Sequence, residues 1–305
     1  MKVFVTGATG FVGQEIVRRL HDAGYAIRIL VRRKPLLRVD GFRGAMDAEI
    51  HVGNILDPLS LKDALKGTDA VIHLVGIISE FRQNTFENVH LMGTRNVVTA
   101  ARDQGVKRFI HMSALGTRPN SVSRYHQTKW EAEEIVRGSG LDFTIFRPSL
   151  IFGPRDMFVN TFAKIIRFSP IVPILGRQDA RFQPVAIDTV ASAFVKALAE
   201  EKAVGQTFAL AGPDTFTMSQ IIDEILAAMN RKRIKIHIAL TLARLQAAFL
   251  EFFFPKILRR AAPLNRDQLV MLQEDNTGNP EPANELFALR PLPFRGGIAK
   301  YLGNR

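Results

Sequence analysis

The sequence contains no cysteine among its 305 residues. This absence excludes disulfide bonds, thiolate metal sites and cysteine nucleophiles, and the other residues predict no metal site. A chain without cysteine fits a reducing compartment. Because a strand is predicted from Lys2 onward, we expect no leader segment and a cytoplasmic location.

Acidic residues are in deficit, with 29 Asp and Glu against 41 Lys and Arg, and the formal net charge is +12. A basic chain favours anionic partners such as phosphate cofactors and acidic lipid surfaces. No nucleic-acid recognition motif accompanies the charge, so a nucleic-acid partner is not expected. The composition, 47% hydrophobic and 23% charged, is that of a globular protein with one large domain or two small ones.

A glycine-rich turn follows the first predicted strand, Lys2–Thr6. Gly7, Gly10 and Gly13 come next in the segment TGATGFVG, and an amphipathic helix begins there. Gly7 suits a tight turn, Gly10 lets a pyrophosphate approach the backbone, and Gly13 lets the helix lie close to the strand. The free N–H groups of the helix then face the phosphates. We therefore predict dinucleotide binding, against the alternative of a purely structural turn.

The end of the second predicted strand, Ala26–Val31, lacks the acidic residue that usually accepts hydrogen bonds from the ribose of NAD. Arg32, Arg33 and Lys34 stand there instead. A guanidinium suits the 2′-phosphate of NADP, which a carboxylate would repel. The sequence thus predicts NADP(H), with NAD(H) less favoured; the alternative is a solvated basic loop.

Alternating strands and helices predict a doubly wound parallel α/β Rossmann sheet with a smaller α/β C-terminal domain. We place the NAD(P)-binding domain at residues 1–152 and a substrate or partner domain, interleaved with the sheet, at 153–305. Further strands are predicted at 49–52, 70–74, 108–112, 143–147 and 207–211. Helices are predicted at 58–66, 85–104, 125–138 and 189–200, and a short one before residue 302.

Two capping signals are predicted in the C-terminal half. Asp188 is expected to cap the helix that starts at Thr189. Thr217 and Gln220 form a capping-box pattern ahead of an apolar helix.

A tyrosine and a lysine four residues apart, Tyr125 and Lys129, share a face of the helix predicted at 125–138. An ammonium beside a phenol stabilises the phenolate, so Tyr125 is predicted to act as a general acid or base with its pKa lowered by Lys129. His73, inside the fourth strand, is interpreted as a packed histidine rather than a base.

These motifs together resemble the extended and atypical short-chain dehydrogenase/reductase superfamily over nearly the whole chain. The resemblance implies that Tyr125 and Lys129 are the catalytic pair, with Lys129 also on the nicotinamide ribose. Asn54 stands at the adenine-contacting position, Asn88 at that of the family's helix-borne asparagine, and Arg147-Pro148-Ser149 near the nicotinamide. The predicted cofactor contacts are Gly7, Thr9, Gly10, Phe11, Val12, Gly13, Arg32, Arg33, Asn54, Ile55, Leu74, Val75, Gly76, Asn88, Lys129, Arg147, Pro148 and Ser149.

One departure from the family pattern concerns the hydroxyl that polarises the substrate carbonyl. The usual run of Ser or Thr is reduced to Ser113 followed by Ala114. Ser113 is the predicted third catalytic residue, with Ser121 and Ser123 as substitutes. The segment between Ser113 and Tyr125 is shorter than in sugar-nucleotide epimerases, which argues against a large nucleotide-sugar substrate.

A finer resemblance is to the NADPH-carrying accessory subunit of respiratory complex I and its bacterial relatives. It rests on residues 113–116, 152–158 and 181–185. It implies an NADP(H)-binding protein linked to quinone metabolism or to a respiratory complex, with NADPH as hydride donor or structural ligand. A small hydrophobic substrate or quinone is the implied ligand. The alternatives are an epimerase or reductase acting on a sugar or isoprenoid, and a redox-sensing regulator.

The segment 238–260 carries apolar residues at helical spacing between basic clusters. The apolar run of 17 residues contains Arg244 and Glu251, so it is too short and too charged to span a bilayer. Such a helix fits the surface of an anionic membrane, which would place the protein on the inner face. The alternative is that the apolar face, with Ile238, Leu242 and Phe249, packs on the small domain.

Overall fold

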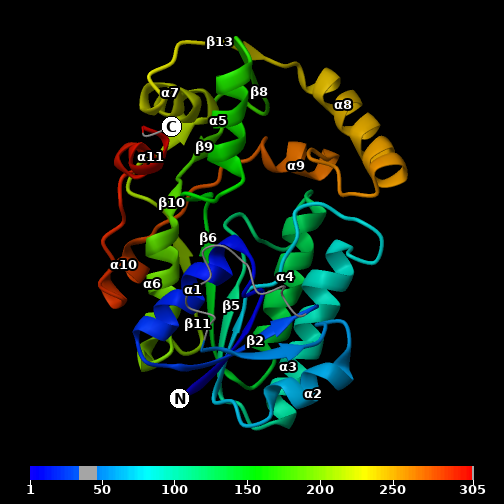
Figure 1. The fold of residues 1–305 in the computed structure, drawn as a ribbon, viewed down its shortest axis with the longest axis vertical. Coiled ribbons are helices and arrows are strands. Elements are labelled where there is room, and N and C mark those ends of the chain that lie inside the picture. Colours follow the sequence, from blue (N-terminus) through cyan, green and yellow to red (C-terminus); the bar gives the residue numbers. More distant parts are fainter. Residues whose placement is uncertain (34–46, 304–305) are drawn as a thin grey trace.

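A seven-stranded parallel sheet lies at the centre of the computed structural model, which describes residues 1–33 and 47–303 (Figure 1). The strand order is β11-β6-β5-β4-β1-β2-β3, and every neighbouring pair is parallel. The order reverses between β1 and β4, where doubly wound sheets bind ligands. This confirms the predicted fold class. The strands are β1 (Lys2–Thr6), β2 (Ala26–Val31), β3 (Glu49–Val52), β4 (Ala70–His73), β5 (Arg108–Met112), β6 (Asp142–Pro148) and β11 (Gln206–Leu210).

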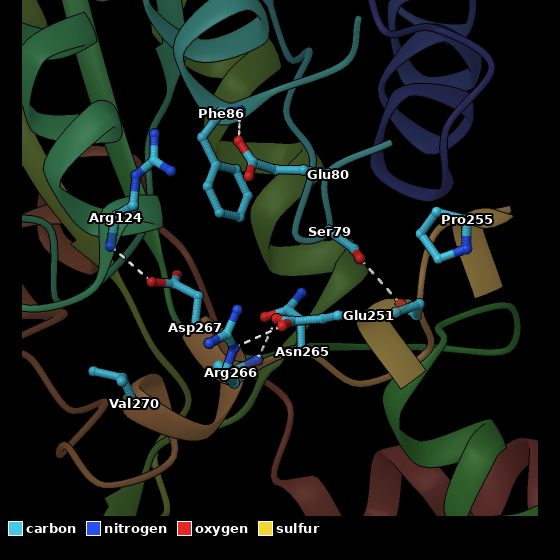
Figure 2. A pocket seen from close by; sticks show the side chains of 11 residues that line it. Ser79, Glu80, Phe86, Arg124, Glu251, Pro255, Asn265, Arg266, Asp267 and Val270 are labelled. Carbon is cyan, nitrogen blue, oxygen red and sulfur yellow. Dashed lines mark hydrogen bonds and ion pairs between the residues drawn. The ribbon is translucent and has the colours of Figure 1, made fainter. Parts of the chain in front are cut away.

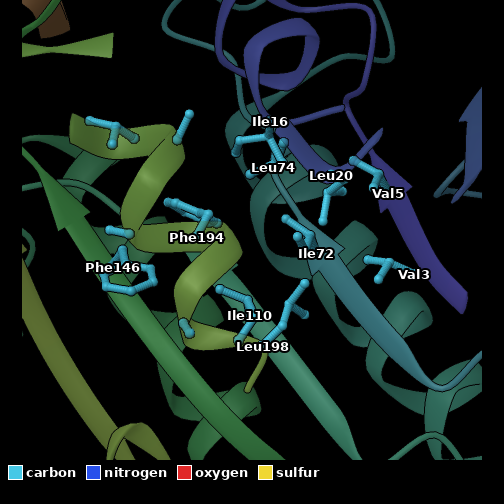
Figure 3. Close-up of a cluster of buried hydrophobic side chains, with 14 of the residues drawn as sticks. Val3, Val5, Ile16, Leu20, Ile72, Leu74, Ile110, Phe146, Phe194 and Leu198 are labelled. Atoms are coloured by element: carbon cyan, nitrogen blue, oxygen red, sulfur yellow. The ribbon is translucent and has the colours of Figure 1, made fainter. Parts of the chain in front are cut away.

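Helices cover both faces of the sheet, because its strands are apolar on both sides. On one face α1 (Phe11–Asp22) and α6 (Ile187–Ala197) pack against alternate strand residues such as Val3 and Val5 (Figure 3). On the other face Phe4 packs with apolar side chains of further helices. These helices are α2 (Pro58–Leu65), α3 (Gly93–Asp103) and α4 (Arg124–Arg137).

Two local predictions for helices need correction. The helix expected over 85–104 is a π-helical segment, η2 (Glu87–Met92), that runs directly into α3. The expectation that Asp188 caps a helix is wrong. The helix α6 starts one residue before Asp188, without a side-chain cap, and Asp188 instead accepts from Arg19 of α1 at 2.6 Å. Its carboxylate thus joins α6 to α1 across the sheet face.

The C-terminal half adds three two-stranded sheets, β7–β10, β9–β12 and β8–β13, around an apolar cluster of its own. The capping box of Thr217 and Gln220 and the helix ending at Leu302 are both confirmed. Because β11 and α6 belong to the main sheet layer, the halves are interleaved; the division at residue 152 stays a prediction. The remaining elements are β7 (Ile151–Phe152), α5 (Phe158–Phe168), β8 (Ile171–Ile174), β9 (Arg181–Phe182), β10 (Val185–Ala186), η3 (Glu201–Ala203), β12 (Phe216–Thr217), α7 (Met218–Ala228), β13 (Ile234–His237), α8 (Leu240–Phe253), η4 (Phe254–Leu258), α9 (Arg266–Met271), α10 (Glu281–Leu286) and α11 (Phe294–Leu302).

The glycine turn after β1 gives a test of the packing between strand and helix. A Cβ on Gly13 would overlap the carbonyl oxygen of Gly7, whereas a Cβ on Gly296 in α11 would meet no atom within 4 Å. We expect Gly13→Ala to lower the free energy of unfolding by about 2–3 kcal/mol or more, since the overlap forces backbone to move. The matched control Gly296→Ala should raise it by roughly 0.5–1 kcal/mol through helix propensity. Urea unfolding midpoints measure both, and an equal effect of the two substitutions would contradict the reading of Gly13 as a contact glycine.

Candidate functional site

The predicted site residues gather at one edge of the sheet. All seven strands run parallel, so their carboxyl ends share that edge, and the predicted residues follow those ends. Gly7 follows β1, Arg32 follows β2, Asn54 follows β3 and Ser113 follows β5. Leu74–Gly76 follow β4, and Ser149 follows β6.

The glycine turn forms a cradle that fits a pyrophosphate. Gly7 has a φ of +75°, which favours glycine, and its carbonyl accepts from Gly10 N at 3.0 Å. Gly10 precedes α1, and no side chain caps that helix. The N–H groups of the first turn of a helix have no partner within the helix, so Phe11, Val12 and Gly13 offer donors to an anion. These donors fit a nicotinamide dinucleotide.

The predicted adenine end of the site lies after β2 and β3, where Asn54 is exposed and Ile55 is buried. Arg32 and Arg33 are exposed, and Lys34 lies outside the described residues. The Oδ1 atom of Asn54 accepts from Leu56 N at 3.1 Å, which fixes the loop around Asn54. The carbonyl of Ile55 accepts from Asn96 of α3 at 2.9 Å. Asn96 therefore ties this loop to α3.

Lys129 is a buried cation beneath the predicted nicotinamide site. Its Nζ donates to the carbonyl oxygen of Met112 at 2.5 Å, and only 3% of the residue is exposed. Burial lowers the pKa of Lys129 to about 8, against the smaller opposing effect of the Glu133 carboxylate. A Cβ on Gly76 would lie 3.9 Å from Nζ, so the ammonium reaches the loop after β4.

Histidines surround this ammonium and are held neutral. His73 is fully buried and hydrogen-bonded to Thr6 and Thr94, as predicted for a packed histidine. Burial, together with the charge of Lys129, lowers the pKa of His73 to about 3. His111 stacks on His73 with ring centroids 5.5 Å apart, and no described residue pairs with either of its ring nitrogens. Burial and then the Lys129 charge also hold the pKa of His111 well below its usual range.

Tyr125 lies half-buried among three rings. The centroids of Phe86, His90 and His126 lie 5.9, 5.3 and 5.2 Å from that of Tyr125, each nearly perpendicular to it. Burial, with a smaller effect of the Asp267 carboxylate, raises the pKa of Tyr125 to about 12. The expectation that Lys129 lowers this pKa is therefore wrong for the structure as it stands, because burial and the Asp267 carboxylate both disfavour the phenolate.

A carboxylate from a distant part of the chain caps the helix that carries Tyr125. Asp267 of α9 accepts from Ser123 Oγ at 2.8 Å, Arg124 N at 2.7 Å and Tyr125 N at 3.1 Å. Figure 2 shows Asp267 facing the Arg124 backbone, beside the ion pair of Arg266 with Glu251. A carboxylate at a helix N-terminus neutralises the free N–H groups, so Asp267 fixes the start of α4.

A cavity of about 470 Å³ opens between the sheet edge and the C-terminal half. Ser113 and Tyr125 both line it, whereas Ser121 and Ser123 do not. Ser113 Oγ lies 3.4 Å from the hydroxyl of Thr117. Other lining residues are Met112, Ala114, Leu115, His126, Pro148, Ser149, Leu150, Ile151, Met157, Phe158, Thr161, Phe162, Leu175, Phe182, Pro263, Leu264, Gln268, Met271, Leu272, Glu274, Asp275 and Asn276.

Three predicted cofactor contacts have structural partners within the protein. The guanidinium of Arg147 binds both carboxylate oxygens of Glu133, at 2.8 and 2.6 Å, and shares this carboxylate with Arg137. The side-chain amide of Asn88 donates to Gln83 O at 2.9 Å and holds the loop before η2. Ser149 Oγ donates to Asn276 Oδ1 at 2.6 Å. The structure therefore places Arg147 and Asn88 in local supporting contacts.

Sequence reasoning missed several residues of this site. His90 contacts the Tyr125 ring, and its Nδ1 lies 2.9 Å from Thr128 Oγ1. Its position two residues after Asn88 on an otherwise apolar stretch was the available signal. Asp267 had no signal, because it acts on Tyr125 across 142 residues.

Comparisons with known proteins agree with this geometry. Residues 7–154 match a family model described as NAD(P)H-binding, and residues 115–194 match one described as male sterility protein. Sterol demethylase protein B of Methylococcus capsulatus is 31% identical over 333 aligned positions, covering 98% of this chain and 96% of that protein. Its length therefore corresponds to that of this chain.

Two other relatives are longer than the aligned region. NADH dehydrogenase (ubiquinone) 1 alpha subcomplex subunit 9 of Mus musculus is 33% identical over 74% of this chain and 61% of that protein. Ceramide reductase of Caulobacter vibrioides is 34% identical over 63% of this chain and 59% of that protein. The chain thus aligns with about three fifths of the length of each.

Solved structures share the fold. A structure described as MoeE5 in complex with UDP-glucuronic acid and NAD superposes with a TM-score of 0.76 and 18% identity, covering 99% of this chain and 98% of that one. The family models and this fold support a nicotinamide cofactor, and they leave the choice between NAD and NADP open.

The buried ammonium makes stability depend on pH. The pKa of Lys129 is about 8 in the folded protein, against 10.5 for an ordinary lysine. Between these values the unfolded chain binds more protons, so stability rises with pH as the buried charge is lost. We expect the free energy of unfolding of the unmodified protein to rise by roughly 3 kcal/mol between pH 8 and pH 10.5. Lys129→Met should abolish this rise, because the titrating group is gone.

Urea unfolding of the nucleotide-free protein at several pH values measures the difference. The exposed Lys107 provides the control, since Lys107→Met should leave the pH profile unchanged. Identical profiles for the unmodified protein and Lys129→Met would show that Lys129 is not a desolvated cation.

Proposed function

The chain belongs to the NAD(P)-binding, epimerase/dehydratase-like family of short-chain dehydrogenases/reductases, and from that premise we propose that it is an NADP(H)-dependent reductase. Relatives in this family include complex I subunit 9 proteins. The proposed substrate is a bulky apolar carbonyl compound. A quinone-related or lipid ketone is the proposed substrate class. The observation that carries the proposal is the cavity that joins Ser113 and Tyr125 to an apolar lining.

The lining favours an apolar substrate over a nucleotide sugar. It is dominated by aliphatic and aromatic side chains such as Phe158, Phe162 and Leu264, and it contains no lysine or arginine among the residues described. A diphosphate group needs cations or free N–H donors, and the acidic side chains of this lining, Glu274 and Asp275, supply neither. The sugar-nucleotide alternative therefore finds little support in this cavity.

The proposed chemistry assigns each polar group a task. A bound reduced nicotinamide supplies the hydride. With its pKa raised to about 12, Tyr125 keeps its proton at neutral pH and is suited to donate it to the carbonyl oxygen. Ser113, close to the hydroxyl of Thr117, donates a hydrogen bond to the same oxygen. Lys129 holds the ribose and keeps positive charge near the developing alkoxide.

The preference for NADP(H) rests on charge at the end of β2. Arg32 and Arg33 are exposed after β2, where an NAD-binding site usually carries a carboxylate. Asn54 supplies a neutral neighbour that does not repel a 2′-phosphate. These residues support NADP(H) as the cofactor.

A second candidate is a structural role for the nucleotide in a respiratory complex. Its support is the resemblance to complex I subunits and the reduced hydroxyl run, with Ala114 directly after Ser113. In that case NADPH stabilises the fold by binding the native state. We place such a protein on the cytoplasmic side, at the inner face of the membrane.

Removing the tyrosine hydroxyl separates the two roles. We expect Tyr125→Phe to lower the NADPH-dependent reduction of a decyl-substituted benzoquinone or a long-chain ketone by at least about 100-fold, since general acid catalysis is lost. NADPH affinity should stay within about twofold, because the phenol is not a phosphate contact. Steady-state kinetics and nucleotide titration measure the two effects.

The matched control is Tyr25→Phe, which alters a tyrosine far from the cavity lining. Undiminished turnover in Tyr125→Phe would remove the acid role. Absence of turnover in the unmodified protein with every apolar carbonyl tested, together with NADPH-dependent stabilisation, would favour the structural role.

The cofactor preference has its own test. We expect the protein to bind NADPH more tightly than NADH, and Arg32→Ala with Arg33→Ala to reduce that preference by about tenfold or more, because two charge-assisted contacts to the 2′-phosphate are lost. Calorimetric titration of both nucleotides measures the ratio. Arg295→Ala with Lys300→Ala, both in α11, is the control of equal charge change. Equal affinities of the unmodified protein for NADPH and NADH would refute the assignment.

A further inference from the structure

The outward face of α8 is apolar, and its inward face is made of small side chains. Ala243 and Ala247 are buried against Leu264 and Leu269. The large residues of the same helix point away from this contact. A surface helix normally buries its large apolar side chains, so this arrangement is reversed. Ile238 packs in this inner cluster, but Leu242 and Phe249 are exposed, so the alternative that the whole apolar face packs on the small domain is wrong.

Six large apolar side chains form this outer face, which continues from α8 into η4. Their exposed fractions range from 47% for Leu258 to 70% for Leu245. Figure 1 shows α8 at the periphery of the molecule, with α9 on its inner side. Contiguous exposed apolar surface of this kind marks an interaction site. The six residues are Leu242, Leu245, Phe249, Phe252, Ile257 and Leu258.

Basic side chains border this outer face. Residues 238–260 contain four exposed basic residues, namely Arg244, Lys256, Arg259 and Arg260. The ammonium of Lys256 lies 4.0 Å from the ring centroid of Phe252, so a charge sits directly beside an outward apolar ring. The one acidic residue of the segment, Glu251, is bound by Arg266 N at 2.8 Å and Arg266 Nε at 2.6 Å. The charge that faces outward is therefore positive.

We propose that this outer face of α8 and η4 docks on the surface of an anionic lipid bilayer. Apolar side chains of an interfacial helix enter the boundary between headgroups and acyl chains, while basic residues at its rim bind lipid phosphates. No helix in residues 1–33 and 47–303 combines the length and hydropathy needed to cross a bilayer. The face therefore lies on the membrane and is held there by both apolar and ionic contacts.

Docking brings the cavity close to the lipid. Leu175 and Leu264 pack in the cluster behind the inner face of α8, and both also line the 470 Å³ cavity. The wall of the cavity is thus the layer directly beneath the docking helix. If the proposed function holds, this proximity makes a lipid dissolved in the bilayer the substrate class. The proposal that α8 docks on a membrane does not depend on the proposed function.

Vesicle binding of the 305-residue chain tests the docking surface. We expect cosedimentation with phosphatidylcholine vesicles that contain phosphatidylglycerol, weaker binding to pure phosphatidylcholine, and release at high salt. Phe249→Ser with Phe252→Ser should weaken binding by about tenfold or more. Arg259→Gln with Arg260→Gln should do the same and reduce the salt dependence.

Matched controls remove the same number of exposed apolar or charged side chains from other parts of the surface. Leu59→Ser with Phe168→Ser removes two exposed apolar side chains on α2 and α5, and Arg290→Gln with Lys300→Gln removes two exposed charges. Both controls should bind vesicles like the unmodified protein. Thermal unfolding and NADPH titration should be the same for all variants, since none of these residues lines the cavity.

Three outcomes would overturn the proposal. The first is protein that stays in the supernatant with anionic vesicles at low salt. The second is binding that the control pairs weaken as much as the α8 pairs. The third is a stable dimer that the Phe249 and Phe252 substitutions dissociate, which would assign the face to a second copy of the chain. Because vesicle binding needs no turnover, its result is independent of the proposed reductase activity.

Discussion

The close contact between the turn after β1 and the first turn of α1 is the constraint on which the nucleotide half depends. Gly13 lies so close to the carbonyl of Gly7 that no side chain fits between them. This contact sets the position of α1 on the sheet and directs its free N–H groups to the carboxyl edge. The core of Val3, Val5 and Ile72 packs beneath it (Figure 3). Anion binding and sheet packing thus use the same backbone geometry.

The ammonium of Lys129 is surrounded by neutral histidine rings and is not paired directly with a carboxylate. The ammonium donates to the Met112 carbonyl, and burial holds His73 and His111 neutral beside it. A desolvated cation is costly unless an anion arrives. A phosphate-bearing or alkoxide-forming ligand therefore gains more from this site than from an exposed lysine, because little water needs to be displaced from the ammonium.

Sequence reasoning recovered the parallel sheet from the strand pattern and the glycine turn from local spacing. The basic end of β2 and the pair of Tyr125 and Lys129 also depend on residues close in the chain, and their roles stay predictions. The pKa of Tyr125 was not recoverable, since it depends on rings and a carboxylate supplied by other elements. The orientation of α8 could not be predicted either. Its sequence shows an apolar stripe but does not show that Ala243 and Ala247 face the protein while the large apolar side chains face outward.

The cap that Asp267 places on α4 has a consequence for the order of assembly. Tyr125 and Asp267 are separated by 142 residues, so this contact closes a very long loop. A chain made from its N-terminus completes β1 to β6 well before α9 has left the ribosome. Until then the first turn of α4 has no carboxylate to satisfy it. The dinucleotide cradle is therefore finished early and the cavity late, and a nascent chain gains a place for its nucleotide before it gains one for a second ligand.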